Sequence, residues 1–173
     1  SYGSYSVDSY ITINSNLLLD GDGTSKNPFI IKSENDLRSI RYNLNAYYKL
    51  NDDIVLTNDW VPIGTVDDPF TGSFDGNNHT ISNIIVNNDY EYTGLFGYVL
   101  NNNEADKYIQ NLTIKDSVVK GENNVGLLIG YIDNGNTYFS YHIDDISLSN
   151  SKVSSLNGNV GALIGYVNLN MRD

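Results

Sequence analysis

A short pattern that occurs three times limits what this chain can fold into. Three segments of alternating apolar residues share it: 81–86, 109–114 and 143–148. Each is followed by an apolar stretch that carries a glycine near its end: Gly97, Gly130 and Gly165. The first element recurs after 28 and then 34 residues, and the glycine after 33 and then 35. Because periods of about 20–50 residues are typical of solenoids and other arrays, we expect a repeat fold.

Each period contains about three short runs of strand-forming residues and no helical spacing. Three strands per period is the content of one turn of a parallel β-helix. We therefore predict an all-β fold, a right-handed parallel β-helix, in which turns stack at about 4.8 Å and like residues form columns. The predicted interior columns are Ile84, Leu112 and Ile146, then Val86, Ile114 and Leu148, and then Phe96, Ile129 and Ile164.

The corners between strands are predicted from glycine and asparagine. The three aligned glycines are expected at corners, because glycine permits a sharp bend or a positive φ. A second column is expected at another turn: Asn83, Asn111 and Asp145. Asparagine side chains in such a column can bond backbone groups and one another. Asp145 interrupts this column, and the sequence gives no reason for the change.

One helix is predicted, at about residues 34–44, as part of an N-terminal cap. Ser33 can cap this helix, with Asp36 three residues later as a shortened capping box. Apolar residues then follow at helical spacing: Leu37, Ile40 and Leu44. The helix is expected to end near residues 43–45, where asparagine can take the left-handed cap conformation. No helix is expected after residue 47.

The pattern divides the chain into three parts. Residues 1–19 are predicted to be a linker with a first strand at 10–13, residues 20–80 a cap with the first turn or turns, and residues 81–173 the repeats. The cap is expected to cover an end that would otherwise expose apolar core and unpaired strand groups. Residues 167–173 are too few to cover the other end. We therefore expect that end to be truncated, or completed by a neighbouring domain or subunit.

Charge and composition exclude several partners. The formal net charge is −11, so we expect no basic face for nucleic acid. Anionic membrane surfaces are disfavoured for the same reason. No apolar stretch approaches the roughly 20 residues that span a bilayer, so membrane insertion is not expected. Cysteine is absent, which excludes disulfides and thiolate metal sites.

About residues 20–167 resemble a repeat region of bacterial surface proteins. The segments Gly94-Leu95-Phe96-Gly97 and 125–130 resemble the GLUG motif, and 21–85 resembles the stretch that precedes it. That motif occurs in large secreted adhesin-like proteins and beside some immunoglobulin A peptidases. The resemblance implies β-helix repeats that serve mainly as extended scaffold. Leu127 and Ala162 stand where later motifs usually carry a second glycine.

An acidic turn at residues 20–24 suggests a calcium loop. An EF-hand needs a carboxylate at loop position 12, and counting from Asp20 that position is Ile31. The EF-hand interpretation therefore fails. A looser cation site stays an alternative without support, a plain glycine turn is preferred, and no cofactor is predicted.

Acids and histidines do not form a recognisable catalytic set. Two carboxylate pairs could serve a lyase or glycosidase: Asp67-Asp68 and Asp144-Asp145. No arginine falls among the repeats to act with them, because the arginines are Arg38, Arg41 and Arg172. A metallopeptidase helix needs two histidines four residues apart with a glutamate, and His79 and His142 do not provide this. We predict solvated turn acids and no catalytic, cofactor-binding or metal residue.

The aromatic residues leave a second function open. Trp60 and the many tyrosines could form a sugar-stacking platform, or they could pack between cap and repeats. We expect a non-catalytic module of a secreted or cell-surface bacterial protein, acting in adhesion or as a stalk. Its expected partners are a surface protein or glycan of a host or neighbouring cell and further domains of a longer protein. The alternative is a carbohydrate-binding or carbohydrate-active β-helix.

Overall fold

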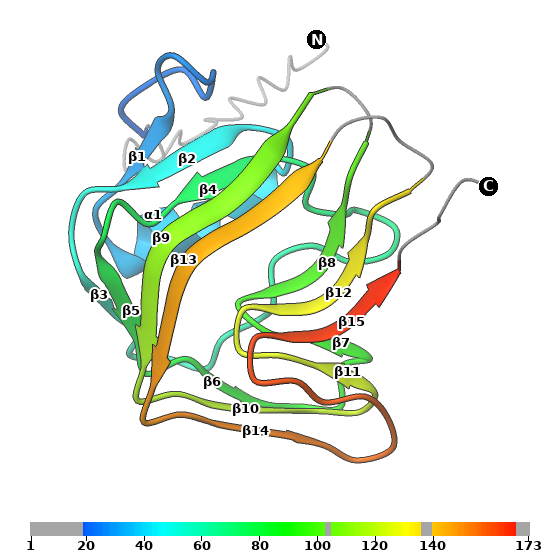
Figure 1. Ribbon diagram of the computed structural model, residues 1–173. Helices are drawn as coiled ribbons and strands as arrows, with labels where there is room; N and C mark the ends of the chain where they lie inside the picture. Colours follow the sequence, from blue (N-terminus) through cyan, green and yellow to red (C-terminus); the bar gives the residue numbers. More distant parts are fainter. Residues whose placement is uncertain (1–18, 103–104, 136–139, 169–173) are drawn as a thin grey trace, which may run out of the picture.

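Parallel strands are the main regular structure in the described part of the chain (Figure 1). The computed structural model describes residues 19–102, 105–135 and 140–168. The strand expected at 10–13 and Arg172 lie outside these residues. Every strand pair in the described ranges is parallel, and none of the described helices is long and apolar enough to cross a membrane.

The described strands form four sheets. The first contains β1 (Phe29–Ile31), β2 (Tyr47–Leu50), β3 (Ile54–Val55), β4 (Ser73–Asp75), β5 (Thr80–Ser82), β9 (Lys107–Lys115) and β13 (Tyr141–Ser149). The second contains β6 (Ile85–Asn87), β10 (Val118–Gly121) and β14 (Lys152–Ser155). The third contains β7 (Tyr92–Thr93) and β11 (Asn124–Val125). The fourth contains β8 (Phe96–Leu100), β12 (Ile129–Asp133) and β15 (Ile164–Asn168).

The chain passes through these sheets in the same order three times. We call the passes the first rung (residues 73–100), the middle rung (107–133) and the last rung (141–168). In the last rung an isolated bridge from Val160 to Val125 takes the place of a strand in the third sheet. Stacked residues of successive rungs are 32 to 35 positions apart. This regular parallel stacking fits a β-helix.

The register confirms one predicted column and corrects two. Phe96, Ile129 and Ile164 do stack, as predicted. Leu112 stacks under Ile146 and Ile114 under Leu148, but the predicted first members of both columns are wrong. Val86 stacks on Val119 and Val153 instead, and Ile81 on Ile114. Ile84 lies beside Ser117, whose hydroxyl accepts its N–H at 3.0 Å.

The error has a conformational cause. Asn83 and Asn111 both have left-handed backbones, with φ of 60° and 54°, and each follows an inward-facing isoleucine by two residues. The same short sequence therefore marks two different corners. Asn83 follows Ser82, which pairs with Lys115, so its equivalents are Asp116 and Asn150, with φ of 52° and 44°.

The other corner explains Asp145. Asn111 follows Gln110, which pairs with Asp144, so Asn111 and Asp145 do share a corner as predicted. Asp145 has a φ of 52°, close to the 54° of Asn111. Aspartate, like asparagine, enters the left-handed region more readily than other non-glycine residues. The corner conformation therefore persists through the substitution.

The repeated glycines align as predicted, but the predicted reason needs correction. Among the described glycines a positive φ occurs at Gly21, Gly23, Gly64 and Gly135, not at the aligned positions. An added Cβ at Gly97 would lie 2.7 Å from the Gly64 carbonyl oxygen, and one at Gly165 would lie 2.5 Å from the Val125 nitrogen. These glycines permit close approach of backbones where the third and fourth sheets meet.

The predicted helix is present and shorter than expected. It comprises α1 (Glu34–Ser39) and a 3₁₀ turn at Ile40–Tyr42. The Ser33 hydroxyl accepts the Asp36 N–H at 3.2 Å, and the Asp36 carboxylate accepts the Lys32 N–H at 3.0 Å. Asn43 ends the helix with φ of −149°, so the predicted left-handed cap is wrong. The last turn tightens into a 3₁₀ form instead, which satisfies the Asn43 N–H through Ile40.

One apolar core runs through the rungs and includes the helix. Leu37 and Ile40 of the helical segment are fully buried in it, together with Trp60 at 1% exposure. The middle rung is closed on both sides, and Ile109, Ile114 and Ile129 are all 0% exposed. The cap segment and the repeats share this core and the first sheet.

Candidate functional site

The acidic turn uses its carboxylates locally. Asp20 forms an ion pair with Lys32 at 2.6 Å, which lowers the pKa of Asp20 through its hydrogen bond and charge. The Asp22 carboxylate accepts the Thr24 N–H at 3.0 Å, and this bond holds the pKa of Asp22 below its usual range. Gly21 and Gly23 have φ of 97° and 77°. Within the described residues no group of three or more His, Asp or Glu side chains could hold a metal ion.

The predicted acid pairs lie on different elements. Asp67-Asp68 lies in an exposed loop before β4, and Asp144-Asp145 lies on the exposed face of β13. Arg38 and Arg41 lie on the helical segment, where both guanidinium groups cover the Trp60 ring at 5.1 and 5.7 Å.

The two histidines are separated in the structure. His79 follows the Asn77-Asn78 turn, and its Nδ1 lies 3.1 Å from an Asp53 carboxylate oxygen. The same oxygen accepts the Thr80 N–H at 2.8 Å, and together these contacts lower the pKa of Asp53. His142 is exposed on β13. The His79 N–H also donates to the Gly76 carbonyl at 2.8 Å, so His79 is part of this turn.

Trp60 is a core residue beside the helical segment, which favours packing between cap and repeats over a sugar-stacking platform for this residue. Its indole N–H donates to the Leu95 carbonyl at 3.0 Å. A tyrosine ladder occupies the surface of the fourth sheet instead. Tyr131 stacks between Tyr98 and Tyr166, with ring centroids 4.9 and 5.1 Å apart. Tyr92 packs edge-on against Tyr98 and Tyr131 at 5.2 Å.

Burial and a neighbouring carboxylate shift the pKa of Tyr98 in this ladder. Burial, reinforced by the Asp133 carboxylate that accepts the Tyr98 hydroxyl at 3.2 Å, raises the pKa of Tyr98 to about 12. Because Tyr131 is covered on both ring faces, a ligand could stack on few of these rings. The ladder therefore resembles packing between rungs more than an open platform.

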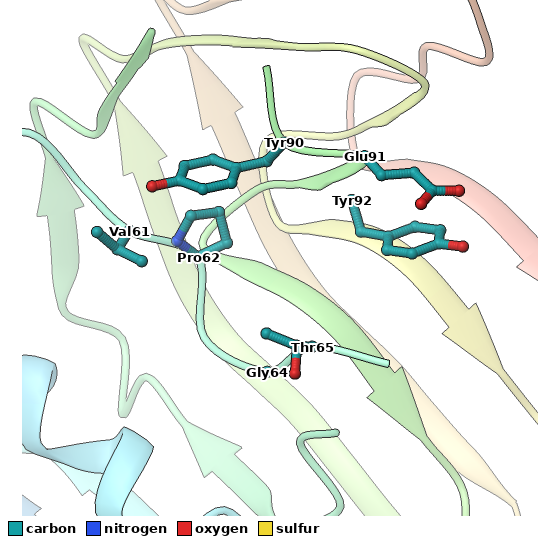
Figure 2. A pocket seen from close by; sticks show the side chains of 7 residues that line it. All are labelled: Val61, Pro62, Gly64, Thr65, Tyr90, Glu91 and Tyr92. Atoms are coloured by element: carbon teal, nitrogen blue, oxygen red, sulfur yellow. The ribbon is translucent and has the colours of Figure 1, made fainter. Parts of the chain in front are cut away.

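Two hollows lie around the loop of residues 61–65, near Tyr92 of the ladder. The first, of about 150 Å³, is bordered by that loop and by Tyr90, Glu91 and Tyr92 (Figure 2). A second hollow of about 350 Å³ is bordered by the same loop and by Arg41, Tyr42 and Asp68. We call these two hollows and their lining the loop groove. Sequence reasoning missed it, because the groove joins the helix end to two loops that are distant along the chain.

The outer side of the last rung is a further exposed apolar surface. Val160 is 52% exposed, whereas Val125, at the same position of the middle rung, is 0% exposed. Other inward-facing residues of the last rung are also only half-buried, whereas the residues that they stack on in the middle rung are buried. They are Ile143, Ile146, Leu148, Val153 and Ile164.

Two curated proteins are similar in sequence. Halomucin of Haloquadratum walsbyi is 39% identical over 124 residues, which cover 65% of this chain and 1% of halomucin. A protein named "Putative Gly-rich membrane protein", from Evansella cellulosilytica, is 30% identical over 144 residues, which cover 78% of this chain and 16% of that protein. The chain thus spans a small fraction of the curated relatives that it matches. No family model matches it.

One solved structure shares the fold. It is the crystal structure of a "putative immunoglobulin A1 protease" from Bacteroides ovatus, with a TM-score of 0.55 and 18% sequence identity. The similarity covers 87% of this chain and 65% of that one. At this identity the likeness concerns the fold alone.

Proposed function

We propose that the chain is a right-handed parallel β-helix of the GLUG-repeat type, and that it acts as a non-catalytic module of a larger secreted or cell-surface protein. Its role in that protein would be that of a stalk or an adhesive scaffold. The aligned Gly97, Gly130 and Gly165 support the repeat type. The small share of each curated relative that the chain spans supports a module within a longer protein.

The observation that carries the scaffold role is the unequal burial within one column. Ile129 is 0% exposed between Phe96 and Ile164, whereas Ile164 is half-buried, and none of the described residues stacks on its other side. A rung of this kind becomes fully buried only when another layer stacks on it. The last rung is therefore suited to continue the stack, and we propose that a further segment or domain of the parent protein covers it.

The surface location rests on the relatives. One of them carries the words "membrane protein" in its name, and another is called halomucin. A module in such a protein would face a host or neighbouring cell, so a surface protein or glycan is the proposed partner. A carbohydrate-active enzyme is the less favoured candidate. A carbohydrate-binding role gains support from the loop groove and its aromatic and charged lining.

The scaffold proposal can be tested by adding one rung. A copy of residues 101–133 would follow Asn168, because β8 ends at Leu100 and β9 begins at Lys107, so the copy includes the connection that its strands need to stack on the last rung. We expect thermal unfolding at a higher temperature and weaker binding of a hydrophobic dye, because the exposed column would be covered. The matched control carries serine at the three copied positions of Ile109, Leu112 and Ile129, and should give neither effect. Equal melting temperatures for the extended and original proteins would contradict the proposal.

A further inference from the structure

The loop groove is held rigidly by backbone bonds. Ile63 donates to the Leu95 carbonyl at 3.0 Å, and its own carbonyl accepts the Gly97 N–H at 2.7 Å. The Thr65 N–H donates to the Asp68 carbonyl at 2.9 Å, while the Thr65 hydroxyl accepts the Asp68 N–H at 3.1 Å. Gly64 lies between these bonds with φ of 83°. A preformed groove binds a ligand without first losing loop entropy.

Arg41 offers unused hydrogen-bond donors to the groove. Its Nε donates to the Arg38 carbonyl at 2.8 Å, and its Nη2 donates to the Val61 carbonyl at 3.1 Å. These two bonds use two of the five N–H donors of a guanidinium group. No ion pair to Arg41 occurs within the part of the chain that the structure describes. The group is therefore fixed in place with donors still available.

Acceptors and aromatic rings complete the lining. The carboxylates of Asp68 and Glu91 are exposed at the two hollows. Tyr42 is 75% exposed, and Figure 2 shows the Tyr90 ring extending over Pro62 while Tyr92 extends to the opposite side. Around one hydrogen-bonded loop, the two hollows thus present a charged donor, charged acceptors and apolar rings.

We propose that the loop groove is a binding site for a neutral oligosaccharide. A sugar ring has apolar C–H faces that pack on tyrosine, and hydroxyl groups that both donate and accept. Arg41 would donate to those hydroxyls, and Asp68 and Glu91 would accept from them. This proposal rests on the adhesive role proposed above, since it names the class of ligand that the module would bind. Oligosaccharide binding can nevertheless be measured whether or not the rungs act as a scaffold.

Other ligands fit this lining less well. An acidic sugar would meet the carboxylates of Asp68 and Glu91 and a chain of net charge −11. A proline-rich peptide packs on aromatic grooves too, but it carries few N–H donors. Such a peptide would offer these two exposed carboxylates few hydrogen-bond donors. A neutral polyhydroxylated ligand satisfies the donors and the acceptors together.

The test is a glycan array with neutral and sialylated or uronate-containing oligosaccharides, followed by calorimetry with the strongest neutral oligosaccharide. Asp68→Asn is paired with Asp67→Asn, which makes the same charge change at a neighbouring exposed residue outside the lining. Tyr42→Ala is paired with Tyr166→Ala, an exposed tyrosine of the ladder. Thermal melts of all four variants establish that they are folded. A ten-residue polyproline peptide is titrated in parallel.

We expect neutral oligosaccharides to bind, and Tyr42→Ala to weaken binding by about tenfold, as expected for loss of one ring contact. Asp68→Asn should also weaken binding, and both control variants should bind as the original chain does. The proposal is overturned by absence of binding to the array, by preference for acidic sugars or polyproline, or by equal effects of the paired variants. The rung-addition experiment measures thermal stability, so its result does not depend on any of these binding outcomes.

Discussion

Asn111 donates from its side-chain amide to the Asp75 carboxylate at 3.0 Å, and so joins the middle rung to the first rung at a corner. Asn111 itself has a φ of 54°. One residue therefore provides both the left-handed bend and a bond between rungs. Its neighbour Leu112 is 1% exposed, so the corner also directs the following strand residues into the core.

Substitutions at Asn111 should separate these two contributions. Asn111→Ala loses the side-chain bond, about 1 kcal/mol, and replaces asparagine with a residue that tolerates the left-handed backbone less well, which costs up to about 1–2 kcal/mol more. Asn111→Gly loses only the bond and should be less destabilising. Chemical denaturation of both variants measures the difference. Equal stability of the alanine and glycine variants would show that backbone conformation contributes nothing here.

Gly130→Ala should destabilise the middle rung strongly. An added Cβ would overlap the backbone of Thr93 and Tyr92, which belong to β7. Overpacking of this kind costs about 1–3 kcal/mol or more, because backbones must move apart. The exposed Lys120→Ala serves as the control on β10 and should change stability little. If Gly130→Ala has the same melting temperature as the original chain, the explanation by close approach of backbones is contradicted.

The column of Ile129 and Ile164 offers a direct measure of end exposure. Ile129→Ala should cost about 2–5 kcal/mol, because a fully buried side chain leaves a cavity. Ile164→Ala should cost less, since Ile164 is only half-buried. In the protein extended by one rung the cost of Ile164→Ala should rise toward that of Ile129→Ala. Denaturant titration of the original chain, the two variants, the extended chain and the extended chain with Ile164→Ala tests this, and an unchanged Ile164 effect would argue against stacking.

Glu34 should make stability depend on pH in the acid range. Burial alone would raise its pKa, but bonds from Thr57 and Arg38 outweigh that effect and lower the pKa of Glu34 from 4.5 to about 2. Because the folded pKa is depressed, this stabilisation is fully present above pH 4.5 and is lost as the pH falls toward about 2.

The corresponding variant is Glu34→Gln. It should lower stability at pH 7 by about 2 kcal/mol, as for loss of charge-assisted hydrogen bonds. The difference from the original chain should shrink between pH 4.5 and about 2. Glu122→Gln, an identical change on another element, is the control. A difference between Glu34→Gln and the original chain that stays constant with pH would contradict the assigned role of the Thr57 and Arg38 bonds.

Sequence reasoning was sound where the signal is local or strictly periodic. The Gly-flanked segments predicted the stacking of Phe96, Ile129 and Ile164, and Ser33 with Asp36 predicted the start of the helix. It was wrong for the columns of Ile84 and Val86, because the same pattern of isoleucine followed by asparagine occurs at two different corners of a rung. Apolar and polar residues also alternate on both sides of each corner, so the sequence does not show which corner is which. The loop groove could not be predicted from Trp60-Val61-Pro62-Ile63-Gly64 alone, since Arg41 and Tyr90 reach it only through the fold.

The sequence by itself determined that this chain makes short strands in a repeat, since glycine, asparagine and alternating apolar residues act locally and recur at a nearly constant period. Tertiary structure decided the register. The two-residue turn at Asn77-Asn78 lets β4 and β5 pair with the single strand β9, and only pairing between rungs reveals that shift. Tertiary structure also decided which exposed groups lie together, because the loop groove and the outer side of the last rung are defined by contacts between distant residues.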